Sequence, residues 1–248
     1  VDDQGTVFVG ARGEIGKLVP DSKGELHFNS LIEDYLSILP QFQEVIQIVI
    51  QKNQVLFFIR EGVISLQDRK IEFKKTDSDI LAAFSVNDKV FVQLKNNGLL
   101  QWQDAVVDFL KSDLLQSDAT LITSILELDD QSLLVATNSL GLLRLRDDAL
   151  SIFDSEANDL LIANPVSCGV RLSDGTLALG TSRKGILRIN QDGEIIQRID
   201  KDASLQNSFV KHLLAVDGNG LYAALNNGIS FVELPSPFSF FDDKAGLE

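Results

Sequence analysis

Hydrophobic residues along this chain fall into short runs that are separated by polar turns. Leu133–Leu145 (LLVATNSLGLLRL) and Leu177–Ile189 (LALGTSRKGILRI) share one layout: an apolar strand, a polar turn, a glycine and a second apolar strand. The first strand of each pair is apolar at successive positions, which indicates a strand that is covered on both faces. The pattern therefore predicts antiparallel β-strands joined by tight turns.

This layout is repeated along the whole chain. The six copies are Thr6–Leu18, Val55–Leu66, Val90–Trp102, Leu133–Leu145, Leu177–Ile189 and Leu221–Val232. Each contains one glycine, at Gly13, Gly62, Gly98, Gly141, Gly185 and Gly228. The glycines are about 36 to 49 residues apart, which is the period of a β-propeller blade and too long for most solenoid coils.

Further strands flank the repeated pair. In the fifth copy, the apolar run Val166–Leu172 comes before it, and a turn at Asp192-Gly193 leads into Glu194–Ile199 after it. Four antiparallel strands form one blade, and a single blade would expose both faces unless others stack on it. We therefore expect an all-β fold: a β-propeller, or a fragment of one, with about six four-stranded antiparallel blades in a seven-bladed or longer array. A β-solenoid and an open sandwich are the alternatives.

One propeller domain is expected over residues 1–248. Its first unit begins at its second strand, and its last ends in Phe238–Phe241 and the linker Asp242–Glu248. Because the chain also contains no Met, we expect it to be truncated at one or both ends. The predicted blades cover approximately residues 1–43, 44–79, 80–119, 120–165, 166–209 and 210–248.

Several strings resemble a known repeat. Asp174–Thr181 (DGTLALGT) followed by Lys184–Ile189 (KGILRI), and Asn219–Leu234 at the end of the chain, resemble the two-component regulator propeller repeat, as does Gly13–Leu31. The second unit departs from it, since Gln54–Ile59 (QVLFFI) lacks a Gly-Thr pair.

The resemblance implies a sensor. In that family such propellers form the periplasmic or otherwise extracytoplasmic sensing part of bacterial membrane-bound regulators, ahead of a triple-tyrosine domain, a membrane helix and a kinase or DNA-binding output. For this chain the resemblance implies a non-catalytic, ligand-sensing segment that reaches the membrane only through parts outside the chain. A homodimer formed through the full-length receptor is a further candidate partner.

The acidic net charge of the chain argues against some classes of partner. The chain has 36 acidic and 22 basic residues, a formal net charge of −14. Nucleic acids and anionic membranes are bound through clustered Lys and Arg, so we expect no nucleic-acid partner for this segment. The single cysteine, Cys168, lies in an apolar strand and is expected to pack in the core. No cofactor is expected.

Candidate catalytic groups are few. His27 and His212 are distant in sequence; His27 is expected on a solvent-facing outer strand and His212 in a structural or channel-lining position. Adjacent carboxylates occur at Asp2-Asp3, Asp129-Asp130, Asp147-Asp148 and Asp242-Asp243, mostly where a turn favours Asp. No zinc, nucleophile or phosphate-binding motif is present, so no catalytic or metal-binding residue is predicted.

Ligand contacts are predicted in the turns between the second and third strands. In propellers these turns lie on the same side as the connections between blades. Arg offers a planar fork of donors and Asn a donor and an acceptor, which suits a sugar or a carboxylate. The predicted residues are Arg12, Arg60, Asn96, Asn138, Arg183 and Asn226. The alternative is that exposed turns simply carry polar residues, and Trp102 is expected to pack between blades rather than stack on a sugar.

Three functions remain open from the sequence. The first is a sensor ectodomain that binds an unknown small molecule or oligosaccharide. The second is a protein-interaction scaffold, and the third is a propeller lyase or glycosidase, which would need facing carboxylates or a His–carboxylate pair.

Overall fold

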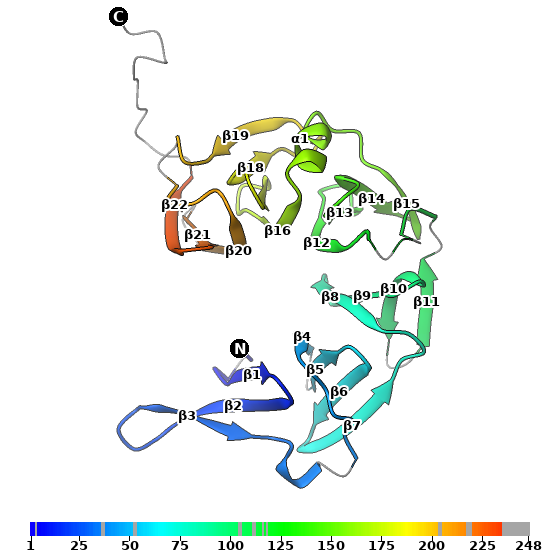
Figure 1. The fold of residues 1–248 in the computed structure, drawn as a ribbon, viewed down its shortest axis with the longest axis vertical. Helices are drawn as coiled ribbons and strands as arrows, with labels where there is room; N and C mark the ends of the chain where they lie inside the picture. The colour runs from blue at the N-terminus through cyan, green and yellow to red at the C-terminus, as the bar shows by residue number, and fades with distance from the viewer. Residues whose placement is uncertain are drawn as a thin grey trace, which may run out of the picture. The chain divides into compact units, whose positions relative to one another are not determined.

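The structure is a computed structural model of the 248-residue chain. It describes residues 1–2, 4–35, 38–51, 54–103, 106–110, 113–115, 117, 119–202, 205–216 and 220–234. Over these residues the chain forms six antiparallel sheets (Figure 1), so the all-β prediction is confirmed. None of the helices in these ranges is long and apolar enough to cross a membrane.

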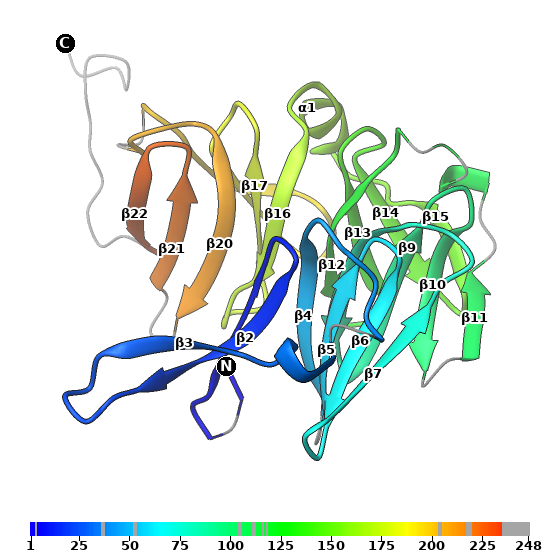
Figure 2. The same cartoon turned by 60° about the horizontal axis from the view of Figure 1, so that its bottom comes forward.

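Strands follow one another through each sheet in chain order (Figure 2). The first sheet contains β1 (Val7–Ala11), β2 (Glu14–Pro20) and β3 (Leu26–Ser30). The second contains β4 (Val45–Gln51), β5 (Gln54–Ile59), β6 (Gly62–Gln67) and β7 (Lys70–Lys75). The third contains β8 (Ile80–Val86), β9 (Lys89–Leu94), β10 (Gly98–Gln103) and β11 (Val106–Leu110).

The remaining sheets have the same order. The fourth contains β12 (Ile122–Glu127), β13 (Leu133–Thr137), β14 (Leu142–Arg146) and β15 (Ala149–Ile152). The fifth contains β16 (Val166–Arg171), β17 (Leu177–Thr181), β18 (Ile186–Ile189) and β19 (Ile195–Ile199), and the sixth β20 (Val210–Val216), β21 (Gly220–Leu225) and β22 (Gly228–Glu233). Each predicted interval thus holds one sheet, while the number of blades in the whole propeller stays a prediction.

Short helices that no pattern in the sequence predicted join some of the sheets. They are the 3-10 helices Glu33–Tyr35 and Asp113–Leu115 and the α-helix α1 (Asn158–Ala163). Asn158 connects α1 to the fourth sheet, because its Oδ1 accepts the Leu142 N–H at 2.9 Å and its Nδ2 donates to the Phe153 carbonyl at 2.6 Å. The segment Phe238–Phe241, in which the last predicted unit ends, and the pair Asp242-Asp243 lie outside the described residues, as does Asp3.

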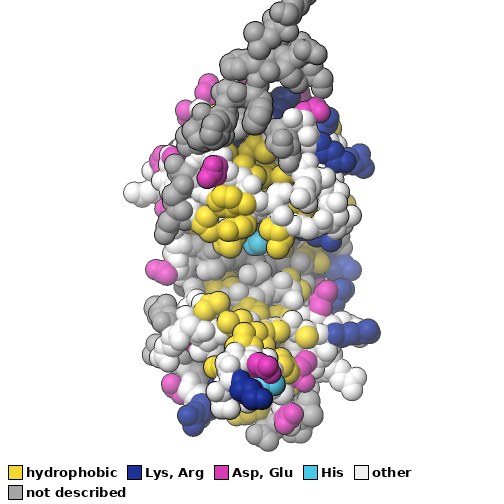
Figure 3. Space-filling view, turned by 90° about the vertical axis from the view of Figure 1, so that its left-hand side faces the viewer, with side chains coloured by type: hydrophobic (Ala, Val, Ile, Leu, Met, Phe, Trp, Pro, Cys, Tyr) yellow, Lys and Arg dark blue, Asp and Glu magenta, His cyan; other side chains and the backbone are white. Residues whose placement is uncertain are grey.

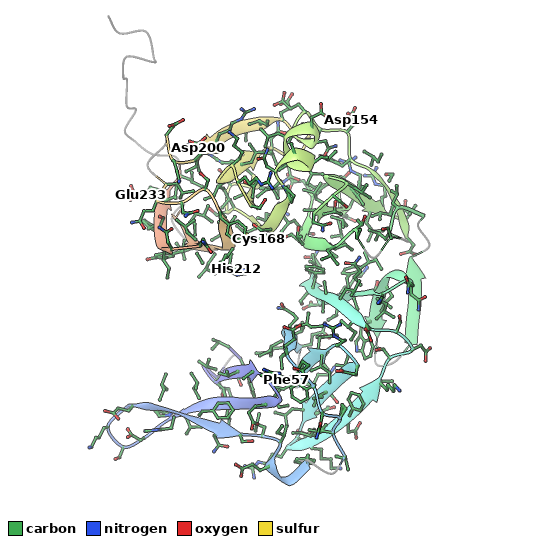
Figure 4. All side chains as sticks on the ribbon, viewed as in Figure 1. Phe57, Asp154, Cys168, Asp200, His212 and Glu233 are labelled. Atoms are coloured by element: carbon green, nitrogen blue, oxygen red, sulfur yellow. The ribbon has the colours of Figure 1, made fainter. Side chains whose placement is uncertain are left out.

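Two compact units divide the chain. The first comprises Val1–Glu127, Gln131–Val135 and Leu143–Ile152, and the second Leu128–Asp130, Ala136–Leu142 and Phe153–Glu248. In the first unit, β5 is buried on both faces. Its residue Phe57 (Figure 4) packs toward the first sheet, with an edge-on contact to Phe8, and Phe58 packs toward the third, with an edge-on contact to Trp102. Trp102 therefore packs between sheets, as predicted.

The turn glycines explain the repeat. All six have positive φ: Gly13 66°, Gly62 158°, Gly98 74°, Gly141 69°, Gly185 70° and Gly228 131°. Side-chain-bearing residues rarely adopt this conformation, so glycine is favoured where the second strand turns into the third.

Small residues are also needed where the first strand of one sheet packs on the second strand of the sheet before it. A Cβ on Gly180 of β17 would lie 2.6 Å from Cys168 Sγ and 2.7 Å from Val210 of β20. The equivalent position in β5 is Phe58. Gly180 pairs with Cys168 and Phe58 with Gln47, and each pair directly follows a register shift in the first strand. Phe58 fits there because small Ala83 of β8 belongs to its cluster. The departure of the second unit from the Gly-Thr pattern is thus accommodated by packing.

Candidate functional site

All six predicted ligand residues lie in the turns that join the second and third strands of their sheets. Arg12, Arg60, Asn96, Arg183 and Asn226 are exposed, and Asn138 is half-buried. Arg12, Arg60 and Asn96 belong to the first compact unit, and the other three to the second. Their combination into one binding surface stays a prediction.

Main-chain hydrogen bonds tie these turns to the connections between sheets. Three turn residues donate their N–H to the residue just before the first strand of the same sheet: Lys95 to Asp79 at 2.8 Å, Ser182 to Pro165 at 2.9 Å and Asn226 to Phe209 at 3.1 Å. The turns and the connections therefore lie at the same end of the third, fifth and sixth sheets.

A buried threonine closes two of the turns. Thr181 is fully buried; its Oγ1 donates to the Gly185 carbonyl at 3.0 Å and accepts the Lys184 N–H at 2.9 Å. Thr137 makes the same bonds with Gly141 and Leu140, at 3.0 and 2.9 Å. A T-x-x-x-G string is the sequence signal for this turn, and it holds Asn138 and Arg183 on a fixed backbone.

Arg60 lines a surface hollow of about 280 Å³ in the first unit. The other lining residues come from the beginnings of two first strands: Glu44 just before β4, Val45 and Ile46 in β4, and Ile80 and Leu81 in β8. The Arg60 carbonyl accepts the Ile80 N–H at 2.8 Å, which fixes the turn against β8. This hollow is the candidate binding site.

Charge and apolar surface meet in the hollow. The Arg60 side chain is 56% exposed, and its Nη1 lies 3.9 Å from Asp79 Oδ2, which is too long for a hydrogen bond. The guanidinium therefore keeps donors available to a ligand, beside Glu44 and the half-buried aliphatic residues Val45 and Leu81. Such a surface suits a compact molecule with an apolar face and acceptor groups, such as a sugar ring or a small carboxylate.

Sequence reasoning found Arg60 but missed the other lining residues. Glu44 and Ile80 were recognised only as the first residues of two predicted blades. Since the turns lie beside the connections that lead into first strands, the first residues of those strands were the sequence signal for the missing lining residues.

One group of potential metal ligands lies in the part of the chain that the structure describes. Asp21, Glu25 and His27 have ligand atoms within 4.8 Å of one another on the β2–β3 hairpin, and all three are exposed. Hydrogen bonds from the Lys23 and Glu25 N–H groups and from His27 lower the pKa of the Asp21 carboxyl. His27 is on the outermost strand of its sheet, as predicted, with Nε2 3.2 Å from Asp21 Oδ2.

A polar network lies at the other ends of the fourth and fifth sheets. Arg188 of β18 is only 9% exposed; its Nε donates to Thr176 Oγ1 at 2.9 Å, and its Nη2 donates to Asp174 Oδ2. Asp174 Oδ1 also accepts Thr176 Oγ1 at 2.6 Å and the Thr176 N–H at 3.0 Å. Nearby, Arg171 Nη2 donates to Asp129 Oδ1 at 2.5 Å. These groups satisfy one another, so we interpret the network as structural.

Cys168 lies in the core between the fifth and sixth sheets (Figure 4), as predicted. Cys168 is 6% exposed, and burial raises the pKa of its thiol to about 11.

We expect Cys168 to react very slowly with Ellman's reagent in the native protein, because the thiolate is the reactive form and little of it exists at pH 8. Labelling in native buffer should be negligible and should become complete in urea. Since the pKa is raised in the folded state, the contribution of this thiol to stability should be present below pH 9 and be lost as the pH rises toward 11. Cys168→Ala should lack that part of the pH dependence, and rapid native labelling would contradict the burial.

Comparisons with known proteins bear on the fold. No protein-family model matches the sequence, and no curated protein matches it. Among solved structures, the extracellular domain of the one-component system BT4673 from B. thetaiotaomicron has a TM-score of 0.73 at 15% identity, covering 95% of this chain and 32% of that chain. Another structure of the BT4673 extracellular domain, described as a hybrid two-component system, has a TM-score of 0.60 at 14% identity, covering 91% and 39%.

A propeller outside this group is also similar. The WD40 β-propeller domain of Doa1 has a TM-score of 0.67 at 12% identity, covering 94% of this chain and 77% of that chain. The chain spans about a third of the length of the first BT4673 structure. At these identities the likeness shows the fold, which is that of β-propellers, and the resemblance to two-component regulator propeller repeats agrees with it.

Proposed function

We propose that this chain is the ligand-sensing, non-catalytic part of a bacterial membrane-bound two-component or related transcriptional regulator. The observation that carries the proposal is the hollow at Arg60, which lies at the end of the sheets where ligand contacts were predicted. The likeness in fold to the extracellular domain of a bacterial regulator supports the same function and a periplasmic or other extracytoplasmic location.

The chemistry of the hollow favours a small molecule or an oligosaccharide that carries acceptor groups. Arg60 would donate to a hydroxyl or carboxylate oxygen, and Val45 and Leu81 would contact a ring face. The overall charge of −14 disfavours highly anionic ligands at long range, so we expect a neutral sugar or one with a single carboxylate.

We expect Arg60→Ala to weaken ligand binding without unfolding the chain, because the Arg60 side chain is exposed while its turn is held by the main chain. The measurement is a thermal-shift screen of neutral and uronate-containing oligosaccharides, followed by calorimetry on any hit. A charge-assisted hydrogen bond from Arg is worth about 1.5–3 kcal/mol, so affinity should fall by about tenfold to a hundredfold.

Arg69→Ala is the matched control. Arg69 is an exposed arginine of the same sheet, in the turn between β6 and β7, at the opposite end from Arg60. It should leave both binding and stability unchanged. A ligand that binds equally well to the wild-type and Arg60→Ala proteins would show that the hollow is not the site.

The scaffold function has one observation in its favour, the exposed apolar face of β20–β22. Leu214, Ile229 and Phe231 on this face are each more than half exposed. An apolar face of this kind often marks a contact with another protein.

A further inference from the structure

The hairpin between β2 and β3 brings three potential metal ligands together. Glu25 and His27 are two positions apart, so their side chains lie on the same face of the hairpin. Asp21 lies opposite Glu25, because the Asp21 N–H donates to the Glu25 carbonyl at 2.9 Å. The ligand atoms of the three side chains lie within 4.8 Å of one another. All three belong to one hairpin, so their proximity does not depend on how the sheets are arranged.

The turn between β18 and β19 of the fifth sheet has the same form and serves as a reference. Asn190 Oδ1 accepts the N–H groups of Asp192 and Glu194, at 3.0 and 2.9 Å. The amide nitrogen of Asn190 then donates to Glu194 Oε2 at 2.8 Å. An asparagine at the start of this turn therefore closes the main chain and also satisfies the glutamate that follows it.

In the β2–β3 hairpin an aspartate takes the place of that asparagine. Asp21 Oδ1 accepts the N–H groups of Lys23 and Glu25 at 2.8 and 2.9 Å, so the turn is closed in the same way. Asp21 Oδ2 replaces the amide nitrogen of Asn190, and an ionised carboxylate cannot donate to Glu25. His27 Nε2 lies 3.2 Å from the same Oδ2. The substitution thus replaces an amide–carboxylate contact with two carboxylates and an imidazole.

An ion can reach the three ligands from solvent. Asp21, Glu25 and His27 are all exposed. They lie on the face that carries Phe8, since His27 pairs with Val19 and Phe8 pairs with Lys17, two positions before Val19. Phe8 contacts the second sheet, so the ligands stay accessible with this neighbour in place. Figure 3 shows acidic and histidine side chains together on the surface of the side that carries the hairpin.

We propose that Asp21, Glu25 and His27 bind a divalent transition-metal ion such as Zn²⁺. An imidazole with two carboxylates suits Zn²⁺, whereas Ca²⁺ and Mg²⁺ prefer oxygen ligands alone. The 3.2 Å between His27 Nε2 and Asp21 Oδ2 is close to the edge of roughly 3.4 Å expected between ligand atoms of a tetrahedral zinc site. Three protein ligands leave one position for water or a group of another molecule. The inference goes beyond the sensor function and does not depend on it.

Calorimetric titration with Zn²⁺ tests the site. Asp21→Asn should fold normally, because Asn190 closes the same turn, and should weaken Zn²⁺ binding by about tenfold or more. Even groups that only support a metal ligand contribute about tenfold to a hundredfold in affinity, so the loss of a ligand should cost at least as much. Asp192→Asn is the matched control, since it removes the same charge from an exposed position of the corresponding turn. It should bind Zn²⁺ like the wild type, and equal binding by the two variants would show that Zn²⁺ is held by acidic surface elsewhere.

Nuclear magnetic resonance of the imidazole rings identifies the ligand directly. His27 and His212 are the two histidines of the chain, so their ring signals can be told apart with one variant. One equivalent of Zn²⁺ should shift the His27 signals and leave those of His212 unchanged, and His27→Gln should weaken Zn²⁺ binding as Asp21→Asn does. The same concentration of Ca²⁺ should shift neither ring, because imidazole is a poor ligand for Ca²⁺. If Zn²⁺ leaves His27 unchanged, or shifts both rings equally, the proposed site is wrong.

Discussion

Gly185→Ala is expected to lower the free energy of unfolding by about 3 kcal/mol or more, because two costs add at this position. Gly185 has φ of 70°, which strains any residue with a Cβ. That Cβ would also lie 2.2 Å from the Ile199 carbonyl oxygen and 3.0 Å from Asp200 Cα, both of which are main-chain atoms. Urea unfolding followed by circular dichroism measures the change.

Gly24→Ala separates the two costs. Gly24 has φ of 84°, but its Cβ would meet no atom within 4 Å, so only the conformational cost of about 1 kcal/mol remains. If both variants lose the same stability, the contact between the turn and the end of β19 is not as close as described.

Asp174→Ala is expected to lower the free energy of unfolding by about 2 kcal/mol, because it leaves Arg188, only 9% exposed, without its carboxylate partner. Breaking a fully buried ion pair costs about 3–5 kcal/mol, and the smaller value allows for the 37% exposure of the Asp174 side chain. Asp192→Ala, in the turn between β18 and β19 of the same sheet, is the control and should change stability by less than about 0.5 kcal/mol.

The effect of Asp174 should depend on pH. Burial raises the pKa of this carboxyl, but the hydrogen bonds from Thr176 and the charge of Arg188 outweigh it and hold the pKa below the usual value. The stabilisation should therefore be present at neutral pH and be lost as the pH falls below about 4. A difference between wild type and Asp174→Ala that stays constant down to pH 2 would contradict an ionised pair.

The strands and turns could be predicted from sequence because their signals are local. The glycines at Gly62 and Gly185 mark a backbone conformation within one turn, and the runs around Phe57 and Leu179 indicate strands that are covered on both faces. The helix α1 was missed because it has only six residues. Two polar residues followed by the apolar run Leu160–Ala163 are too few to show a helical period, so the segment could not be distinguished from an irregular connection.

The candidate site was only partly predictable. Arg60 could be found because its turn repeats in every unit, but the hollow depends on how Val45 and Ile80 of two neighbouring sheets meet that turn. That meeting depends on the packing of one sheet on the next, which no pattern within a single unit contains. The packing of Phe58 against Ala83 could not be predicted for the same reason, because the two residues belong to different sheets.

The way the turns are tied to the connections has a consequence for how such proteins diverge. The bonds from Lys95, Ser182 and Asn226 use only main-chain groups, which every residue except proline supplies. Side chains in these turns can therefore be exchanged during evolution with little cost to folding. A fold held in this way tolerates wide divergence in sequence, as the TM-score of 0.73 at only 15% identity to the extracellular domain of BT4673 illustrates.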